Sequence, residues 1–236
     1  MIESSYQVSI KSILELQSEE IDAMVALYLS YYESSCKDQV LNDLKTKDEI
    51  LLLRYDGVLV GFTTYQLYHT TFNTRAIAVL FSGDTIVHHE HWGQQKFNFA
   101  WAKRVGAFYK ALKDEAFYWF LIVKGHRTYR YLPAFAHSFY PHYAVDRSDL
   151  KPLLDYLAYE KFQDAYNDQR GIIHFKVSQG HLKSSYAYPT KREMHHDAVR
   201  YFMQQNPAYV SGDELACLCE IKEENFKPLT KRLMLG

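Results

Sequence analysis

The strongest constraint on the fold is the stretch from residue 49 to residue 87, whose pattern predicts three consecutive strands. Two apolar runs, at residues 49–55 and 58–68, are separated by Asp56-Gly57, a dipeptide that favours the tight turn of a β-hairpin. A third run covers residues 74–87 and contains Gly83, which predicts a β-bulge or the close approach of a ligand. Strands joined by such short turns predict an antiparallel sheet.

A long helix and a buried strand follow these strands. Residues 96–116 carry an apolar stripe at helical spacing, formed by Phe97, Ala100, Trp101, Val105, Phe108 and Leu112. Residues 117–123 are all apolar, which is typical of a strand that is covered on both faces. Helices are also expected at residues 19–33, with Ser18 as the N-cap, and at 37–46, 149–168 and 191–204, with strands at 171–178 and 214–221.

The expected fold class is α/β (α+β), with a mixed, mostly antiparallel central sheet and helices on both faces. Neither a repeat nor a linker divides the chain, so we expect one domain over residues 1–236.

Composition gives little support to several classes of function, although a local basic patch remains open. The 27 basic and 28 acidic side chains give a net charge of −1, so there is no general reason to expect nucleic acid or a membrane surface as a partner. Cys36, Cys217 and Cys219 lie in packing contexts, as expected for reduced thiols in the cytosol. No signal peptide is recognisable, and the longest apolar run, residues 116–123, is too short to span a bilayer. We therefore expect a cytoplasmic protein with no membrane span.

The loop before the long helix contains His88, His89, Glu90 and His91, and two interpretations compete for it. Imidazole and carboxylate groups bind zinc, but adjacent histidines rarely hold one ion and the HExxH pattern is absent, so we assign no metal ligands. The start of the long helix offers unpaired N–H groups and a positive dipole end, which favours an anion site at Gly93.

The loop and the order of the elements around it resemble those of the GNAT superfamily of N-acyltransferases. The resemblance covers the order of elements across roughly residues 20–143 and the loop before the long helix. The family's loop reads Arg or Gln, two residues, Gly, one residue, then Gly or Ala. Residues 90–95 read Glu-His-Trp-Gly-Gln-Gln, of which Gly93 matches. The segment 119–143 looks like that of poorly characterised bacterial proteins with the same fold.

The resemblance implies that the strands at 76–87 and 117–123 diverge and that a pantetheine arm lies between them, with its amides on the free strand edge. The donor would be acetyl-CoA or a longer acyl-CoA, with an acyl carrier protein as the alternative carrier. The acceptor would be a small-molecule or peptide amine, entering from the opposite side. Residues 144–213 would be a family-specific insertion or extension, and a homodimer is a further expectation.

The resemblance also implies site residues. An amine acceptor needs a base, and the departing thiolate needs an acid. The candidate bases are Asp84, His88, His89 and Glu90, and the candidate acids are Tyr129, Tyr131 and Tyr140. The residues expected to hold the coenzyme are Trp92, Gly93, Gln94, Gln95 and Lys96.

Two further segments have both a functional and a structural interpretation. Lys124, His126, Arg127 and Arg130 form either a basic mouth for a phosphate or an acceptor carboxylate, or a solvated helix face. Residues 184–196, which include Tyr186 and Tyr188, either cover the acceptor cleft as a lid or only pack against the domain.

Two other functions remain open. The chain could be a non-catalytic ligand-binding or interaction protein on the same fold. A metal-dependent hydrolase built on His88, His89 and Glu90 is the third hypothesis.

Overall fold

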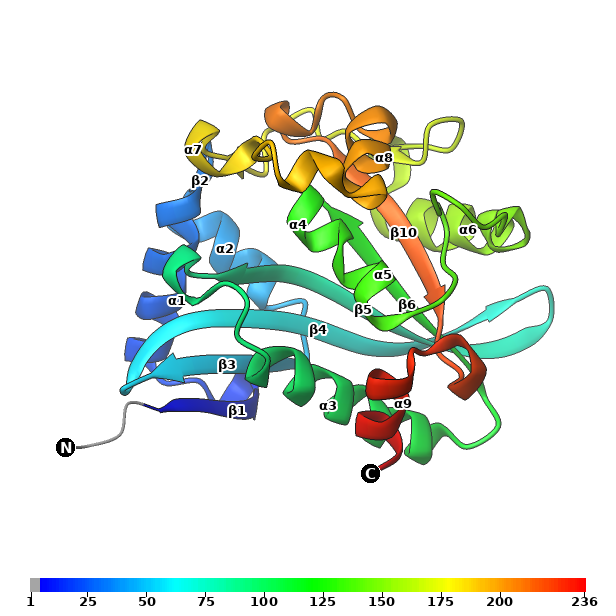
Figure 1. Cartoon of the computed structure of the whole chain (residues 1–236), viewed down its shortest axis with the longest axis horizontal. Coiled ribbons are helices and arrows are strands. Elements are labelled where there is room, and N and C mark those ends of the chain that lie inside the picture. The colour runs from blue at the N-terminus through cyan, green and yellow to red at the C-terminus, as the bar shows by residue number, and fades with distance from the viewer. Residues whose placement is uncertain (1–4) are drawn as a thin grey trace.

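The computed structural model describes residues 5–236 and contains an eight-stranded sheet in the order β1-β3-β4-β5-β6-β10-β8-β7. Figure 1 shows this sheet with helices above and below it. The strands of the sheet are β1 (Tyr6–Ser12), β3 (Glu49–Tyr55), β4 (Val58–Phe72), β5 (Arg75–Val87), β6 (Ala116–Val123), β7 (Tyr166–Asn167), β8 (Ile172–Ile173) and β10 (Glu214–Glu220). β5 and β6 are parallel, and the other ladders of this sheet are antiparallel. The predicted fold class is confirmed.

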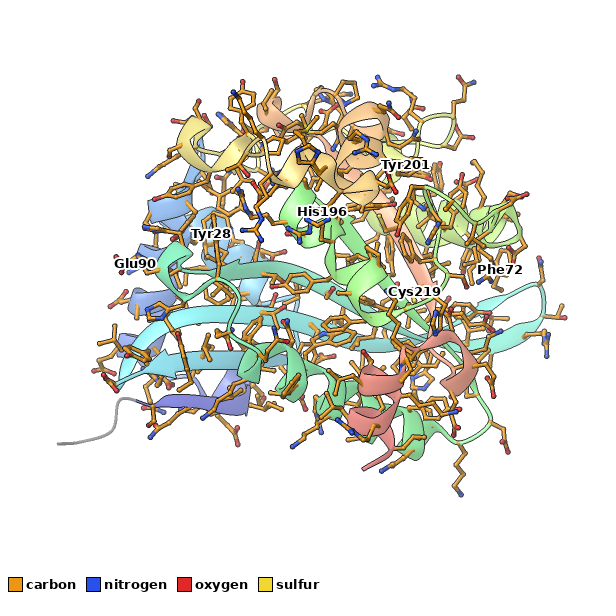
Figure 2. All side chains as sticks on the ribbon, viewed as in Figure 1. Tyr28, Phe72, Glu90, His196, Tyr201 and Cys219 are labelled. Atoms are coloured by element: carbon orange, nitrogen blue, oxygen red, sulfur yellow. The ribbon has the colours of Figure 1, made fainter. Side chains whose placement is uncertain are left out.

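The helices cover both faces of the sheet. They are α1 (Ser18–Tyr31), α2 (Lys37–Leu44), α3 (Lys96–Leu112), α4 (His126–Tyr129), α5 (Tyr131–Phe135), α6 (Lys151–Phe162), α7 (Ser184–Ala187), α8 (Asp197–Gln205) and α9 (Pro228–Leu235). The largest hydrophobic cluster joins the sheet to α3, α5, α8 and α9. Two clusters on the other face join it to α6 and to α1 with α2. Side chains fill the spaces between helices and sheet (Figure 2).

A β-bulge in β5 separates its two halves. The register between β4 and β5 shifts so that Gly83 and Asp84 together lie opposite Thr64. The pairing of β5 with β6 ends at Ser82, which pairs with Leu121. The two strands therefore diverge after the bulge. The bulge predicted from Gly83 is confirmed.

Several predicted boundaries were wrong. Helix α6 ends at Phe162, because Gln163 has a φ of 47° and turns the chain out of the helix. The strand expected at 171–178 shrinks to β8, and α8 begins at Asp197 rather than at residue 191. The N-cap of α1 is Gln17 rather than Ser18, and its backbone N–H donates to Glu20 Oε2 at 3.1 Å. Strand β1 and helix α9 were not predicted.

The cysteines of β10 are packing residues, as the sequence predicted. Cys217 and Cys219 are both buried in the largest hydrophobic cluster, and burial raises the pKa of each thiol. Within residues 5–236, the helices are all too short or too polar to cross a bilayer.

Candidate functional site

Two cavities flank the place where β5 leaves β6. The first, of about 380 Å³, lies beside the start of α3 and is here named the loop-side cavity; its walls include Val87, Trp92 and Gly93. The second, of about 600 Å³, is named the acid-side cavity; its walls include Asp84 and Glu214. Thr85 and Thr128 line both, and they also line a small cavity of about 20 Å³ between the strands. The two larger cavities thus meet at the divergence of β5 and β6.

The start of α3 forms one wall of the loop-side cavity. Gly93 has a φ of +91°, a left-handed conformation that favours glycine. Gln94 Oε1 accepts the N–H of Phe97 at 3.0 Å, which caps the first turn. Of the residues expected to hold the coenzyme, Trp92, Gly93 and Gln94 line the cavity, whereas Gln95 and Lys96 do not. Lys96 Nζ instead donates to the carbonyl of Tyr6 at 3.1 Å.

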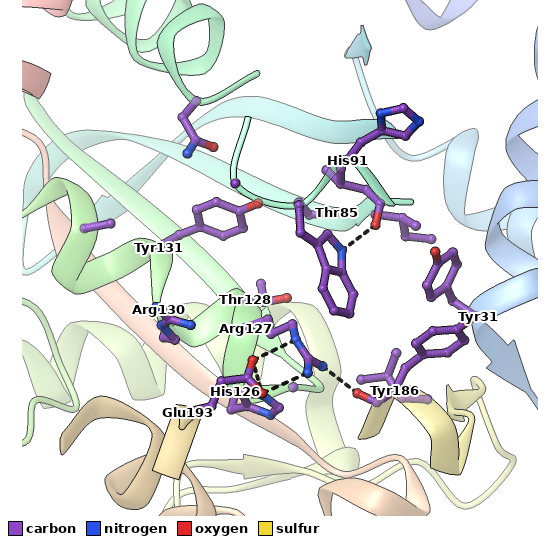
Figure 3. A pocket seen from close by; sticks show the side chains of 18 of the residues that line it. Tyr31, Thr85, His91, His126, Arg127, Thr128, Arg130, Tyr131, Tyr186 and Glu193 are labelled. Carbon is purple, nitrogen blue, oxygen red and sulfur yellow. Dashed lines mark hydrogen bonds and ion pairs between the residues drawn. The ribbon is translucent and has the colours of Figure 1, made fainter. Parts of the chain in front are cut away.

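The second half of β5 has a free edge toward this cavity. The N–H of His88 donates to the carbonyl of Val60 on β4 at 2.7 Å. Because hydrogen-bonding groups alternate in direction along a strand, the carbonyl of Val87 faces the other side. Trp92 Nε1 donates to this carbonyl at 2.7 Å (Figure 3). The edge therefore has a hydrogen-bond acceptor that is covered by a half-exposed indole.

Two arginines face the same cavity and differ in their partners. Arg127 donates to the carbonyl of Tyr186 at 2.7 Å and to Glu193 Oε2 at 3.1 Å, and its guanidinium lies 4.3 Å from the Trp92 ring centroid (Figure 3). Within residues 5–236, the side chain of Arg130 has neither an ion-pair partner nor a hydrogen-bond partner. Arg130 is therefore the cation of this wall that a ligand phosphate can bind without displacing an existing partner.

His126 is buried beside this pair. Its imidazole is 1% exposed, and burial together with the Arg127 charge lowers its pKa to about 4. His126 is thus neutral near pH 7. The predicted basic mouth is divided, because Lys124 lines the acid-side cavity while Arg127 and Arg130 line the loop-side cavity.

Asp84 is one of the carboxyl residues that line the acid-side cavity. Burial raises its pKa to about 7, and the neighbouring Asp43 carboxyl adds to this rise. The ammonium groups of Lys124 and Lys47 oppose it. Lys124 lies 3.4 Å from Glu214, while Lys47 lies 2.6 Å from Asp43. Of the predicted bases, Asp84 lines this cavity and titrates near neutrality.

The histidines of the loop have structural partners. The Tyr31 hydroxyl and His89 Nδ1 form a hydrogen bond of 2.9 Å, and the Tyr6 hydroxyl does the same with His91 Nδ1 at 2.9 Å. Across residues 5–236, no group of three or more histidine, cysteine, aspartate or glutamate side chains is arranged to hold a metal ion.

The other base candidates are less suitably placed. His88 Nδ1 lies 3.9 Å from Glu90, whose side chain is 73% exposed. His88, His89 and Glu90 line neither cavity.

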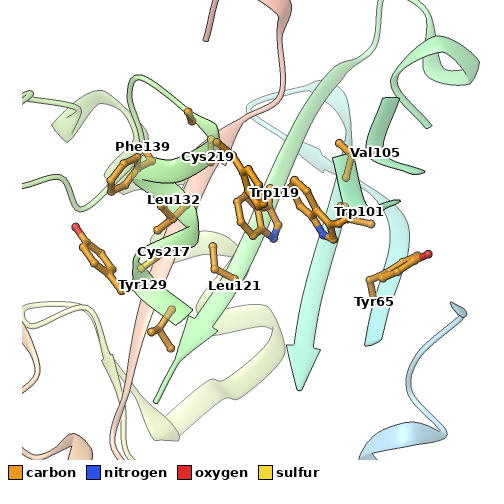
Figure 4. Close-up of a cluster of buried hydrophobic side chains, with 14 of the residues drawn as sticks. Tyr65, Trp101, Val105, Trp119, Leu121, Tyr129, Leu132, Phe139, Cys217 and Cys219 are labelled. Carbon is orange, nitrogen blue, oxygen red and sulfur yellow. The ribbon is translucent and has the colours of Figure 1, made fainter. Parts of the chain in front are cut away.

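The tyrosine candidates for the acid differ in whether their side chains line a cavity. Tyr129 is buried among Leu132, Phe139 and Cys217, and its hydroxyl donates to the carbonyl of Pro141 at 2.7 Å (Figure 4). Tyr140 pairs with Leu218 through its backbone. Neither side chain lines the loop-side or the acid-side cavity, so the structure does not bring them to the site.

Tyr131 does reach the site. It lines the loop-side cavity and the small cavity between the strands, and burial raises its pKa to about 12. The register of the short helices α4 and α5 after β6 determines which tyrosine side chain faces the loop-side cavity. The sequence alone did not predict this register.

The segment 184–196 covers the loop-side cavity. Tyr186 and Glu193 line that cavity, whereas Tyr188 is 59% exposed and lines neither cavity. Arg127 holds this segment at the cavity wall, because it donates to the Tyr186 carbonyl and to Glu193.

Comparisons with known proteins find partial similarity to solved structures and no closer relative. No family model matches the sequence, and no curated protein matches it. The chain is similar to a conserved protein of unknown function from Enterococcus faecalis V583, described as a probable N-acyltransferase. The identity is 15% and the TM-score 0.41, over 53% of this chain and 32% of that chain.

Two other solved structures are similar over a larger share of their own length. An acyl-CoA N-acyltransferase from Pseudomonas aeruginosa is 18% identical with a TM-score of 0.41, over 56% of this chain and 88% of that one. A GNAT family N-acetyltransferase from Escherichia coli in complex with CoA is 12% identical with a TM-score of 0.39, over 56% of this chain and 69% of that one. The structure shows the divergence of the strands at 76–87 and 117–123 that the resemblance implies, because the parallel pairing of β5 with β6 ends at Ser82 and Leu121.

Proposed function

We propose that this protein is an N-acyltransferase that moves an acyl group from a coenzyme A thioester to an amine. The observation that carries the proposal is the position of Asp84. Its carboxyl group lies at the bulge where β5 leaves β6, in the lining of the acid-side cavity, and has a pKa of about 7. A base with a pKa near the working pH is the group that such a transfer requires.

The loop-side cavity supports a thioester donor. A pantetheine arm has amide groups that can extend a sheet edge, and the Val87 carbonyl faces away from β4. The diphosphate would lie against the start of α3 near Gly93, where the helix dipole is positive, with Arg130 as the cation opposite. Trp92 must release the Val87 carbonyl before the arm takes its place. An acetyl donor, a longer acyl donor and a carrier-protein donor all use this same arm.

The acid-side cavity supports the amine acceptor. The amine nitrogen attacks the thioester carbonyl carbon through the gap at Thr85 and Thr128, and Asp84 accepts the amine proton. The carbon–sulfur bond then breaks. Tyr131 is the acid proposed for the departing thiolate, because its pKa of about 12 keeps its hydroxyl protonated near pH 7. The products are an amide and free coenzyme A.

The test combines binding and turnover in the full chain. Acetyl-CoA, octanoyl-CoA and palmitoyl-CoA are titrated by calorimetry, and thiol release is then followed with a panel of primary amines. The Asp84→Asn variant should bind the thioester within about threefold of the natural protein and lose at least about 100-fold in kcat. Asp168→Asn is the matched control, because Asp168 is exposed and lines neither cavity.

A second candidate function is a ligand-binding protein that does not catalyse transfer. The contacts of Trp92 with Val87 and of Arg127 with Glu193 favour it, because they occupy groups that a donor would use. Thioester binding without thiol release by any amine, unchanged in Asp84→Asn, is the result that this candidate predicts. Absence of thioester binding contradicts the proposed N-acyltransferase.

A further inference from the structure

Five charged residues line the acid-side cavity: two carboxylates in ion pairs, Lys124 as the partner of one of them, and two groups of opposite sign that have no ion pair within residues 5–236. Asp43 is paired with Lys47 at 2.6 Å, and Glu214 with Lys124 at 3.4 Å. Asp84 and Lys161 are the remaining charged groups in the lining of this cavity. Asp84 is the proposed base, and the proposed function gives Lys161 no role.

Lys161 is a half-buried cation at the end of α6. Its Nζ donates to Gln66 Oε1 at 3.0 Å and lies 4.2 Å from the ring centroid of Phe81. Among the ion pairs of residues 5–236, none involves Lys161. A neutral amide and an aromatic face are weaker partners for an ammonium group than a carboxylate.

The surroundings of Lys161 leave its charge incompletely compensated. Burial and the nearby Lys47 lower the pKa of Lys161, while Asp43 and Asp48 act in the opposite direction. Both carboxylates have other partners, because Asp43 is bound by Lys47 and Asp48 accepts the N–H of Leu67 at 2.8 Å. An anion that entered the cavity beside Lys161 would offset the free-energy cost of burying its charged ammonium group.

We propose that the acceptor is a primary amine that also carries an anionic group, with the amine at Asp84 and the anion at Lys161. The role of Asp84 in this inference rests on the proposed function. A carboxylate and a phosphate share the chemistry that Lys161 recognises, since an ammonium group binds either as a point charge.

The geometry also bears on the length of the acceptor. Lys161 lies over Phe81, and Phe81 precedes Asp84 by three residues on β5, which is at most roughly 10 Å of chain because the strand bulges at Gly83 and Asp84. We expect the amine and the anion to be separated by several bonds rather than by one carbon atom. Phe162 and Phe175 line the same cavity and would contact the methylene groups between them. The volume of about 600 Å³ is sufficient for a ligand of this kind.

The first measurement compares acceptors of equal length in the thiol-release assay with a fixed acyl-CoA. 6-Aminohexanoate and a six-carbon aminoalkyl phosphate should each have a kcat/KM at least tenfold above that of hexylamine, and their ratio to each other identifies the anion. Lys161→Met should remove this preference, so that the ratio of kcat/KM for the anionic acceptors to kcat/KM for hexylamine falls to about one. Lys161→Arg should keep the preference. Lys103→Met is the control, because Lys103 is exposed on α3 on the other face of the sheet.

Equal rates for hexylamine and the anionic acceptors in the natural protein would overturn the proposal, as would a preference that survives Lys161→Met. A second measurement separates this failure from failure of the proposed function. Binding of 6-aminohexanoate is measured by calorimetry on the full chain without thioester. Binding that is weakened at least tenfold in Lys161→Met supports the anion site even if no amine releases thiol. Binding equal in the two proteins contradicts the site.

Discussion

Lys47 lies directly over Gly83, where a Cβ would come within 2.7 Å of Lys47 Cε and 3.2 Å of Thr64 Oγ1. The same lysine holds Asp43, whose carboxyl group raises the pKa of Asp84. Because Gly83 has no side chain, it leaves space for Lys47, and Lys47 helps to set the charge of Asp84, the proposed base.

Gly83→Ala should displace Lys47 and destabilise the fold by about 1–3 kcal/mol, because a methyl group is forced into a filled space. Chemical denaturation measures the loss. Gly57→Ala is the comparison, since Gly57 has a φ of +83° and no atom within 4 Å of its Cβ position. Both variants should lose stability, but only Gly83→Ala should shift the pH profile of the reaction. An unshifted profile in Gly83→Ala contradicts the link between Lys47 and Asp84.

Asp84→Asn should change the dependence of stability on pH. The pKa of Asp84 is about 7 in the folded protein and about 4 when the chain is unfolded, so the folded state binds the extra proton between these values. The natural protein therefore loses stability as pH rises from about 4 to about 7. Asp84→Asn should match it near pH 4 and be the more stable of the two at pH 8. Equal stability of both proteins at pH 8 would show that Asp84 ionises as freely as in water.

Much of the sheet could be predicted from the sequence, because its signals are local. The bounds of β3 were predicted, and those of β5 and β6 to within one residue, since apolar runs and Asp56-Gly57 define them. Strand β1 was missed because its residues are mostly polar or half-exposed. Asp84 was one of four candidate bases named on the resemblance, because the implied reaction needs a group that accepts the amine proton.

Lys161 and Glu193 could not be predicted as site residues, because their roles depend on contacts between distant segments. Lys161 and Glu193 lie far along the chain from the bulge, and only folding brings them to the cavity walls. Tyr131, whose side chain lines the loop-side cavity, is only two positions from Tyr129, which does not. The two helices that carry them have four and five residues, and the register of such short helices cannot be read from sequence periodicity.

Arg127→Met should loosen the segment that covers the loop-side cavity. The guanidinium holds this segment at the Tyr186 carbonyl and at Glu193. Hydrogen bonds from Thr190, and then the Arg127 charge, lower the pKa of Glu193 to about 2. Hydrogen exchange at residues 184–195 should become at least tenfold faster, while α3 stays protected. Arg130→Met serves as the control, because Arg130 lacks these contacts within the described residues and should leave exchange unchanged. Unaltered exchange in Arg127→Met would mean that the segment is held by other contacts.

Trp92 should report donor binding by its fluorescence. Its side chain is 44% exposed in the lining of the loop-side cavity, whereas Trp101 and Trp119 are 5% and 3% exposed in the core. Adding an acyl-CoA should change the emission of the natural protein, because the indole must leave the Val87 carbonyl. Trp92→Phe should lose this change while still binding the thioester by calorimetry. A change that persists in Trp92→Phe would place the response at another tryptophan.

The pH dependence of thiol release tests the central claim most directly. The measured quantity is kcat/KM for one acyl-CoA and one amine between pH 5 and 9, in the natural protein, in Asp84→Asn and in the exposed control Asp168→Asn. Because Asp84 must be ionised to accept the proton, kcat/KM should rise with pH to a plateau, with its midpoint near the Asp84 pKa of about 7. Asp168→Asn should reproduce this profile, and Asp84→Asn should be at least about 100-fold slower on the plateau. Turnover in Asp84→Asn at the natural rate with the same midpoint would contradict the assignment of Asp84 as the base.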